Sequence, residues 1–276
     1  MDGTALYYMM IPLLLLVLLF LYYKRDSLGY TIAVLVSGAT FIFVLFNTVY
    51  SPKNNHAVAF QGAARNGDLE IIPIKDQVLL DAPVIKQLPE LPRGCEVTAL
   101  AMLLESAGVH ADKMKLAKEV KKDPTPRIVK NGKVHFGNPH EGFVGNMYTF
   151  SEPGLGVYHE PIMELGEKYL PGQMVNLTGE SFEELKIPLS SGRPVWVIIN
   201  AEYRELDDSY FETWETTSGP IKVTMKEHSV LITGYDGQYV YFNDPLTGKK
   251  NKKAPIQDFE KSWVQMGSQA LTYSGD

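Results

Sequence analysis

The chain has 276 residues, of which 45% are apolar and 21% are charged. These values are ordinary for a packed protein and exclude wholesale disorder and fibrous architectures. The 32 acidic residues outnumber the 26 lysines and arginines, and this net charge of −6 argues against nucleic acid as a partner. A single cysteine, Cys95, excludes an intramolecular disulfide, a zinc finger and an iron–sulfur cluster.

Two uncharged apolar segments, residues 5–23 and 29–50, come first in the chain. Each is long enough to span a bilayer, and tyrosines lie near their boundaries, as is typical of membrane–water interfaces. A cleaved signal peptide is disfavoured because no basic residue precedes the first segment and no small-x-small pattern follows Tyr23. We therefore predict two transmembrane helices in residues 1–50 and a lipid bilayer as a partner, with a buried hairpin in a soluble core as the alternative.

The orientation of this hairpin follows from its flanking charges. The turn contains Lys24 and Arg25, whereas only Lys53 soon follows the second span. Because basic residues favour the cytoplasmic side, we expect the turn to be cytoplasmic. The predicted localisation is therefore a membrane protein with two spans, with everything after Ser51 extracytoplasmic.

Residues 51–68 mix proline, asparagine, glycine and small residues without an apolar period, which predicts a linker. A folded domain is expected over residues 69–276. It opens with two short apolar runs interrupted by proline, at 69–74 and 78–84, which are typical of edge strands.

The next segment changes to helical periodicity. Apolar residues at i, i+3, i+4 and i+7 after Gly94 predict an amphipathic helix that ends at Gly108. A second helix is predicted at 111–121. Residues 123–156, rich in proline and glycine, indicate a long irregular connection, and loops of that length commonly bind a ligand.

The second half predicts one helix and three strands, at 181–189, 194–200, 230–235 and 238–243. Ser181 and Glu184 have the spacing of a helix capping box. Asp236-Gly237 is a favoured hairpin turn between the last two strands. A helix followed by antiparallel strands indicates an α+β fold.

Cys95 opens the first helix, where unpaired backbone N–H groups and the macrodipole favour a thiolate. Gly94 leaves room for a substrate carbonyl to approach the sulfur. The alternative for a lone cysteine is a small buried hydrophobic residue.

A nucleophilic thiol needs a base, and His228 is the best placed of six histidines because it begins a predicted core strand. Asp244, just past the next strand, would meet His228 at the same end of a hairpin and hold its tautomer, although Asp244-Pro245 is also a plain turn starter. Gln87 and the backbone N–H of Cys95 are candidate oxyanion donors. An exposed loop residue is the alternative for Gln87.

Four blocks resemble the bacteriocin-processing, or double-glycine, cysteine peptidase-like family, which is papain-like in fold. They are QLPELPRGCE with the following TALAMLL, GFVG, HSVLITGYD and YFNDP, at residues 87–104, 142–145, 228–236 and 241–245. The resemblance covers roughly residues 80–273. It implies a papain-like fold, in which a helix carrying the nucleophile packs on an antiparallel sheet.

Carried over by position, the resemblance implies Cys95 as nucleophile, His228 as general base, Asp244 as its orienting partner and Gln87 as oxyanion donor. Substrate-binding positions are assigned to Gly94, Gly142, Phe143, Gly145 and Glu227.

Two departures from the family limit the resemblance. The chain lacks the G-x-x-x-x-G-K-[ST] loop of transporter-linked members, so it does not power export itself. Glu227 stands where many relatives have glycine, and a carboxylate at the cleft rim would raise the basicity of His228 or repel acidic substrates. The aromatic-rich insertion at 202–227 is either a flap packed by its own side chains or a substrate-recognition element.

We expect no cofactor and no metal. Three histidines and two glutamates in the middle of the chain lack any established ligand spacing: His135, His140, His159, Glu141 and Glu160.

The sequence thus predicts a membrane-anchored cysteine peptidase that cleaves a peptide or protein substrate through an acyl-enzyme. We expect residues 142–156 and 202–227 to set its specificity. One alternative is a non-catalytic module that binds a peptide or the cell surface. Another is an accessory subunit whose hairpin docks on a transporter or other membrane protein.

Overall fold

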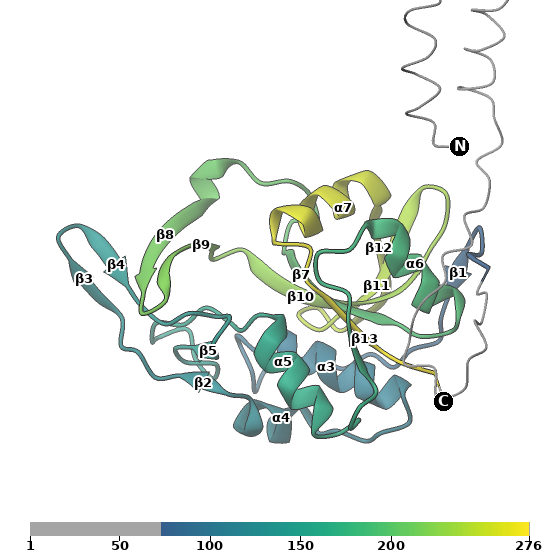
Figure 1. Cartoon of the computed structure of the whole chain (residues 1–276), viewed down its shortest axis with the longest axis horizontal. Helices are drawn as coiled ribbons and strands as arrows, with labels where there is room; N and C mark the ends of the chain where they lie inside the picture. Colours follow the sequence, from purple (N-terminus) through teal and green to yellow (C-terminus); the bar gives the residue numbers. More distant parts are fainter. Residues whose placement is uncertain (1–72, 276) are drawn as a thin grey trace, which may run out of the picture. The chain divides into compact units, whose positions relative to one another are not determined.

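The computed structural model describes residues 73–275 of the chain (Figure 1). The two predicted membrane spans, the predicted linker and the predicted domain start at residue 69 lie outside this range. Among the described residues, no helix combines the length and apolar character that a membrane crossing requires.

The centre of the fold is a seven-stranded antiparallel sheet. Its strands are β1 (Val78–Leu79), β6 (Met174–Asn176), β7 (Val195–Asn200), β10 (Glu227–Tyr235), β11 (Tyr239–Asp244), β12 (Lys249–Pro255) and β13 (Ala270–Tyr273). The strand order is β12-β11-β10-β7-β13-β6, and β1 pairs with the end of β10 that β7 leaves free. The predicted hairpin at residues 230–243 is therefore present as β10 and β11, with its turn at Asp236-Gly237.

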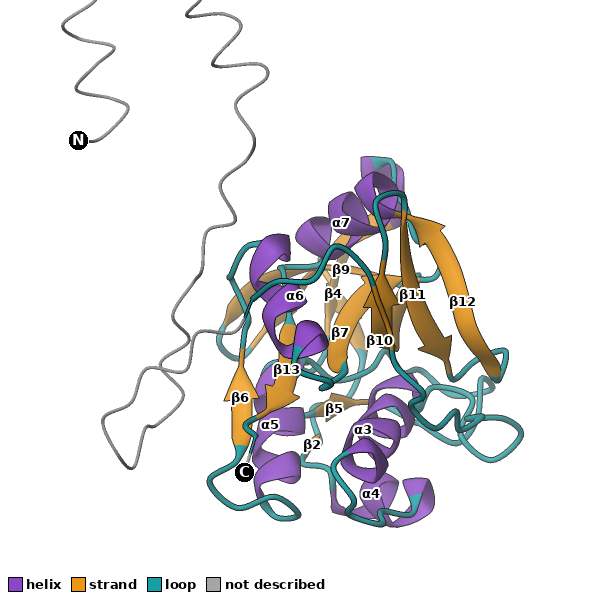
Figure 2. Cartoon of the chain, turned by 90° about the vertical axis from the view of Figure 1, so that its right-hand side faces the viewer, coloured by secondary structure: helices purple, strands orange, loops and turns teal. Residues whose placement is uncertain are grey.

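Helices cover both faces of this sheet (Figure 2). They are α3 (Cys95–Ser106), α4 (Lys113–Glu119), α5 (His159–Glu167), α6 (Phe182–Ser190) and α7 (Ile256–Gln265). Side chains alternate along β7, so Trp196 and Ile198 join the core of α3 and α5, whereas Val197 and Ile199 join the core of α6 and α7. The entire strand is buried because both of its faces are covered.

A second, smaller sheet joins the middle of the chain to the predicted insertion. It contains β3 (Ile128–Lys130), β4 (Lys133–His135), β8 (Phe211–Thr216) and β9 (Gly219–Thr224), and the 3-10 turn η1 (Asp208–Tyr210) leads directly into β8. The strand order is β3-β4-β8-β9, with β4 and β8 parallel. Trp214 on β8 packs against Phe136 and Val144, so the insertion is not a flap packed only by its own aromatics.

The predicted irregular connection at 123–156 is therefore wrong in part. It holds the β3–β4 hairpin, whose turn residues Asn131 and Gly132 both have positive φ. Asn-Gly is the favoured sequence for such a turn, so the signal was present in the sequence. Two further strands, β2 (Lys122–Asp123) and β5 (Phe143–Val144), pair in parallel.

Three local predictions also differ from the structure. Helix α3 is not amphipathic, because every residue from Cys95 to Leu104 is buried between the sheet and the neighbouring helices. The predicted strand at 78–84 contributes only the two residues of β1. Ser181 is the N-cap of α6, but its side chain makes no capping hydrogen bond. The α+β fold with an antiparallel sheet is confirmed.

Candidate active site

Cys95 is the first residue of α3 and is 6% exposed. The preceding Gly94 packs so tightly that a Cβ there would lie 2.6 Å from the Cβ of Leu91. The Gly94 carbonyl accepts the N–H of Thr98 at 3.0 Å, which starts the helix. Glycine is therefore required here by the close approach of the Leu91 side chain, and it places the sulfur at the first helical turn.

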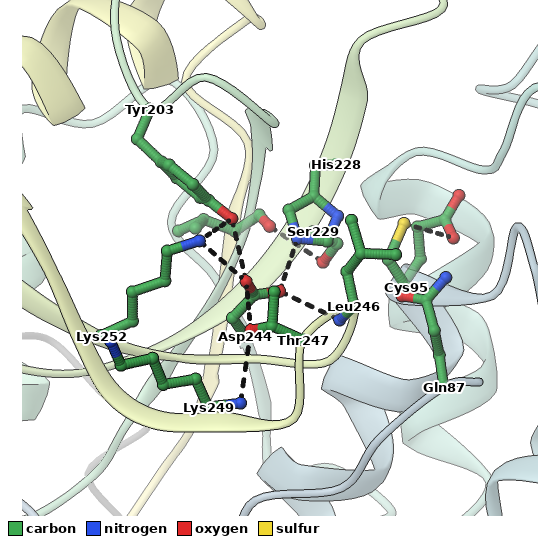
Figure 3. A network of polar contacts seen from close by, with 12 residues as sticks. Gln87, Cys95, Tyr203, His228, Ser229, Asp244, Leu246, Thr247, Lys249 and Lys252 are labelled. Atoms are coloured by element: carbon green, nitrogen blue, oxygen red, sulfur yellow. Dashed lines mark hydrogen bonds and ion pairs between the residues drawn. The ribbon is translucent and has the colours of Figure 1, made fainter. Parts of the chain in front are cut away.

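His228 and Asp244 lie side by side, as the hairpin predicts. His228 is the second residue of β10 and Asp244 is the last residue of β11, so the antiparallel pairing brings their side chains to one end of the sheet. His228 Nε2 lies 3.0 Å from Asp244 Oδ1, and both side chains are buried. The second ring nitrogen, Nδ1, lies on the side of the ring that faces Cys95 (Figure 3).

Asp244 is held as a carboxylate by a network of donors. Its oxygens accept four further hydrogen bonds at 2.8–3.1 Å, from Leu246 N, Tyr203 Oη, Thr247 Oγ1 and Lys252 Nζ. Burial raises the pKa of Asp244, but the bonds from His228, Thr247 and Lys252 outweigh it and hold that pKa well below its ordinary value. A fixed carboxylate favours the His228 tautomer that carries its proton on Nε2.

The sulfur of Cys95 points toward a carboxyl group. Sγ donates to Glu96 Oε2 at 3.3 Å, and in the described part of the chain no hydrogen bond joins it to His228. Burial, followed by the charges of Glu96 and Glu227, raises the pKa of Cys95 well above its ordinary value, although a backbone hydrogen bond from Ser229 lowers it. The helix start alone predicts an easier thiolate, but it is outweighed because the sulfur is enclosed beside two acids.

Glu96 and Glu227 are two carboxyls at this site whose environment the sequence did not reveal. Glu96 is fully buried, its Oε1 accepts the N–H of Val157 at 2.7 Å, and burial raises its pKa to about 7. Burial and the charge of Glu96 raise the pKa of Glu227 well above its usual range. Glu227 is half-buried, and its Oε1 is buried, so the carboxyl is turned inward. An acidic residue next to a cysteine in a buried helix was the available signal for Glu96.

Gln87 lies beside Cys95 and is 2% exposed, so it is not an exposed loop residue (Figure 3). Its backbone N–H donates to Pro245 O at 2.9 Å, which ties it to the loop after Asp244. Its Nε2 donates to two carbonyl oxygens, Leu91 O at 3.1 Å and Pro92 O at 3.0 Å. Its Oε1 is buried without a hydrogen-bond partner.

The middle block divides into packed and exposed positions. Phe143 is fully buried in the main core, and a Cβ on Gly142 would lie 2.6 Å from the backbone of Asp123. Gly145 is exposed with a positive φ of 79°. Gly142 and Phe143 are therefore enclosed by the packing around β5, and of these three positions only Gly145 reaches the surface.

A cavity of about 370 Å³, called here the flap cavity, lies between the middle segment and the insertion. Its lining residues are Arg93, Arg127, Phe136, Phe150, Ser151, Glu152, Pro153, Gly154, Glu212, Trp214 and Met225. Arg93 is two residues from Cys95, and Met225 is two residues from Glu227. The flap cavity therefore lies along the chain segments that lead into both halves of the site.

Two groups in the described residues bring possible metal ligands within 4.8 Å of one another: Cys95 with Glu96 and Glu227, and His140 with His159 and Glu160. In the second group the carboxylate of Glu160 lies 2.8 Å from His140 Nδ1 and 3.2 Å from His159 Nδ1, which are distances of ordinary hydrogen bonds. The expectation of no metal stays a prediction.

Comparison with known proteins identifies the family to which the chain belongs. The Bacillus subtilis (strain 168) protein YvpB, which is uncharacterised, is 45% identical over 194 residues, or 70% of this chain and 74% of its own. The crystal structure of a candidate C39-like peptidase from Bacillus anthracis has 51% identity and a TM-score of 0.68, and the match covers 73% of this chain and 99% of that chain. Residues 79–271 match the Peptidase_C39-like family. The chain therefore belongs to that family, as its four sequence blocks suggested.

Proposed function

We propose that the chain is a cysteine peptidase that hydrolyses a peptide bond through Cys95, His228 and Asp244. The observation that carries the proposal is the buried hydrogen bond of 3.0 Å between His228 and Asp244, next to Ser229, whose backbone hydrogen-bonds to Cys95 at the start of α3. An imidazole whose Nε2 is held by a carboxylate keeps Nδ1 as the nitrogen that can accept a thiol proton.

The reaction would begin with transfer of the Cys95 proton to His228 Nδ1. The thiolate then attacks the carbonyl carbon of the substrate, and the imidazolium gives its proton to the departing amine nitrogen. Water, deprotonated by His228, releases the acid from the acyl-enzyme. Asp244 stays a carboxylate throughout and stabilises the imidazolium.

The oxyanion of the tetrahedral intermediate needs donors in place. The backbone N–H of Cys95 at the start of α3 is one, and Gln87 Nε2 is the other. Gln87 must release one of the two carbonyl oxygens, Leu91 O or Pro92 O, to donate to the oxyanion. Substrate binding would thus exchange one hydrogen bond of this amide for another.

The flap cavity is the proposed subsite for substrate side chains. It is lined by both segments expected to set specificity, and its apolar residues Phe150 and Met225 are 68% and 58% exposed. Such a surface fits apolar side chains of an extended peptide. We expect Phe150→Ser and Met225→Ser to change the ranking of peptides in a cleavage library without changing Cys95 alkylation. An unchanged ranking in both variants contradicts this subsite.

Residues 5–23 and 29–50 are proposed to anchor this peptidase in a bilayer, with the catalytic domain outside the cytoplasm. The support is their uncharged length and the basic turn between them. Carbonate extraction of membranes tests the anchor, and protease treatment of intact and of permeabilised cells tests the side. Purification in mild detergent tests the alternative of an accessory subunit through a co-eluting membrane protein.

The catalytic proposal is tested by alkylation of Cys95 with iodoacetamide in the full chain, which has one cysteine. We expect alkylation below about pH 8.5, the ordinary thiol pKa, to depend on proton transfer to His228, so that the rate there falls in His228→Ala. Peptide turnover should be lost in Cys95→Ser. An ordinary thiol titration, indifferent to His228→Ala in a folded protein, contradicts hydrolysis and favours a non-catalytic binding module.

A further inference from the structure

Each of the two elements that form the proposed active site carries a second acid beside its catalytic residue. Glu96 follows Cys95 on α3, and Glu227 precedes His228 on β10. The sulfur and a carboxyl oxygen of each glutamate lie within 4.8 Å of one another. Two carboxyl groups thus lie close to the proposed nucleophile, and that of Glu96 is in hydrogen-bond contact with it.

In the described part of the chain, no cation compensates the charge of this carboxyl pair. Within residues 73–275, the Glu96 carboxyl accepts hydrogen bonds from Val157 N–H and the Cys95 thiol, and Glu227 Oε1 is buried without a hydrogen-bond partner. A Cβ on Gly156 would lie 2.2 Å from Glu96 Oε1 and 2.8 Å from Glu227 Oε2, so both carboxyls pack over this glycine. Among the described residues no lysine or arginine forms an ion pair with either. Two enclosed carboxyls without a cation do not both ionise, and the pair retains a proton.

The ionisation of the two carboxyls depends on the groups around them. The other titratable groups around the pair are the thiol of Cys95 on α3, the imidazole of His228 on β10 and the hydroxyl of Tyr158 before α5. Burial raises the pKa of Glu96 to about 7, and burial together with the charge of Glu96 raises the pKa of Glu227 well above its usual range. The pair therefore shares a proton near neutral pH, and Glu96, whose Oε2 accepts the thiol hydrogen, is the member whose charge acts directly on the sulfur.

We propose that Glu96 is a positioning residue whose charge decides whether the Cys95 proton is held or released to His228. When Glu96 is ionised, its Oε2 accepts the thiol hydrogen and its charge opposes a thiolate 3.3 Å away. When Glu96 is protonated, that charge is absent and the thiol proton transfers to Nδ1 of His228. The inference rests on the proposed function of Cys95 and His228, and it predicts a peptidase that loses activity as the pH rises through neutrality.

The experiment compares iodoacetamide alkylation across pH in the full chain, in Glu96→Gln and in Glu105→Gln, a matched control on the same helix. The wild-type rate should fall from about pH 6 to about pH 8, and Glu96→Gln should be about tenfold faster than wild type at the upper end, the factor for one pKa unit. At the acidic end of the pH range, the wild-type and Glu96→Gln rates should agree within about twofold, because the side chain at position 96 is neutral in both proteins. Glu105→Gln should follow wild type.

Glutamine separates charge from packing, because its amide oxygen can still accept the Val157 N–H. A Glu96→Gln profile equal to wild type overturns the inference. If His228→Ala slows alkylation while Glu96→Gln changes nothing, only this inference fails, whereas indifference to His228→Ala removes the proposed function itself. Should Glu96→Gln not fold, infrared spectroscopy of wild type supplies the test. A protonated-carboxyl band that persists at neutral pH and is lost in Glu227→Gln supports the pair, and its absence overturns it.

Discussion

Replacing Asp244 by asparagine tests the electrostatic centre of the site. The carboxylate is fully buried and accepts hydrogen bonds from His228 Nε2, Lys252 Nζ and three other donors. Asparagine keeps one acceptor oxygen but replaces the other by an NH2 group. That group faces donors whichever way the amide is turned, so at least one donor set loses its acceptor.

The loss of folding stability in Asp244→Asn can be estimated from these contacts. Removing one partner of a buried charge pair destabilises by about 3–5 kcal/mol. The Lys252 side chain is 27% exposed and regains some hydration, so the lower end, about 3 kcal/mol, is expected. For a domain of roughly 200 residues each kcal/mol lowers Tm by about 2–4 °C, which gives a loss of about 6–12 °C at neutral pH.

The stabilisation by the Asp244 carboxylate should decrease as the pH is lowered. The folded-state pKa of Asp244 is lowered, so its stabilisation is present above the unfolded-state pKa of about 3.9 and is lost as the pH falls below it. The difference in Tm between wild type and Asp244→Asn should therefore be full at neutral pH and should narrow below about pH 4.

Thermal unfolding followed by circular dichroism from neutral to acidic pH measures both quantities. Asp236→Asn is the matched control, since Asp236 is partly exposed at the other end of the same hairpin and asparagine is a favoured turn residue. A Tm loss under about 2 °C at neutral pH, or a difference that does not narrow in acid, refutes the reasoning.

Three further substitutions test packing around the site, each by chemical denaturation. Gly94→Ala should destabilise the protein by about 1–3 kcal/mol because the new Cβ meets the Leu91 side chain at 2.6 Å. The control Gly237→Ala should not, because there is open space around Gly237. Equal effects of the two substitutions contradict the close approach at Gly94. Trp214→Ala should cost about 3–5 kcal/mol through the cavity left in the second sheet, and a near-neutral result would mean that this sheet does not unfold with the core. Tyr203→Phe should cost about 0.5–1.5 kcal/mol by removing the hydrogen bond from the hydroxyl to Asp244, and a neutral effect argues against that bond.

Local patterns in the sequence determined much of the framework. The helix at Cys95, the central strand at 195–200 and the β10–β11 hairpin could be predicted because each depends on apolar periodicity, a helix start or a turn dipeptide. The pairing of His228 with Asp244 followed from that hairpin, since antiparallel strands bring residues near their free ends together.

The second sheet could not be derived in the same way. Strand β4 pairs with β8 across about 80 residues of chain, and neither strand has an apolar pattern that specifies its partner. Trp214 is buried only because Phe136 and Val144 come from the middle segment. Contacts between distant segments depend on the packing of the whole domain, which short-range propensity does not encode.

The surroundings of Cys95 were likewise determined in part by the sequence and in part by the tertiary structure. The sequence by itself determined that Cys95 begins a helix, next to a glycine and an acid, and that His228 begins a core strand. Only the tertiary structure decided that Glu96 and Glu227, which are 131 positions apart, lie together beside the sulfur, with no ion-pair partner among the described residues. The physical reason is that a pKa depends on burial and on neighbouring charges in space, and both are set by the packing of α3 against β10.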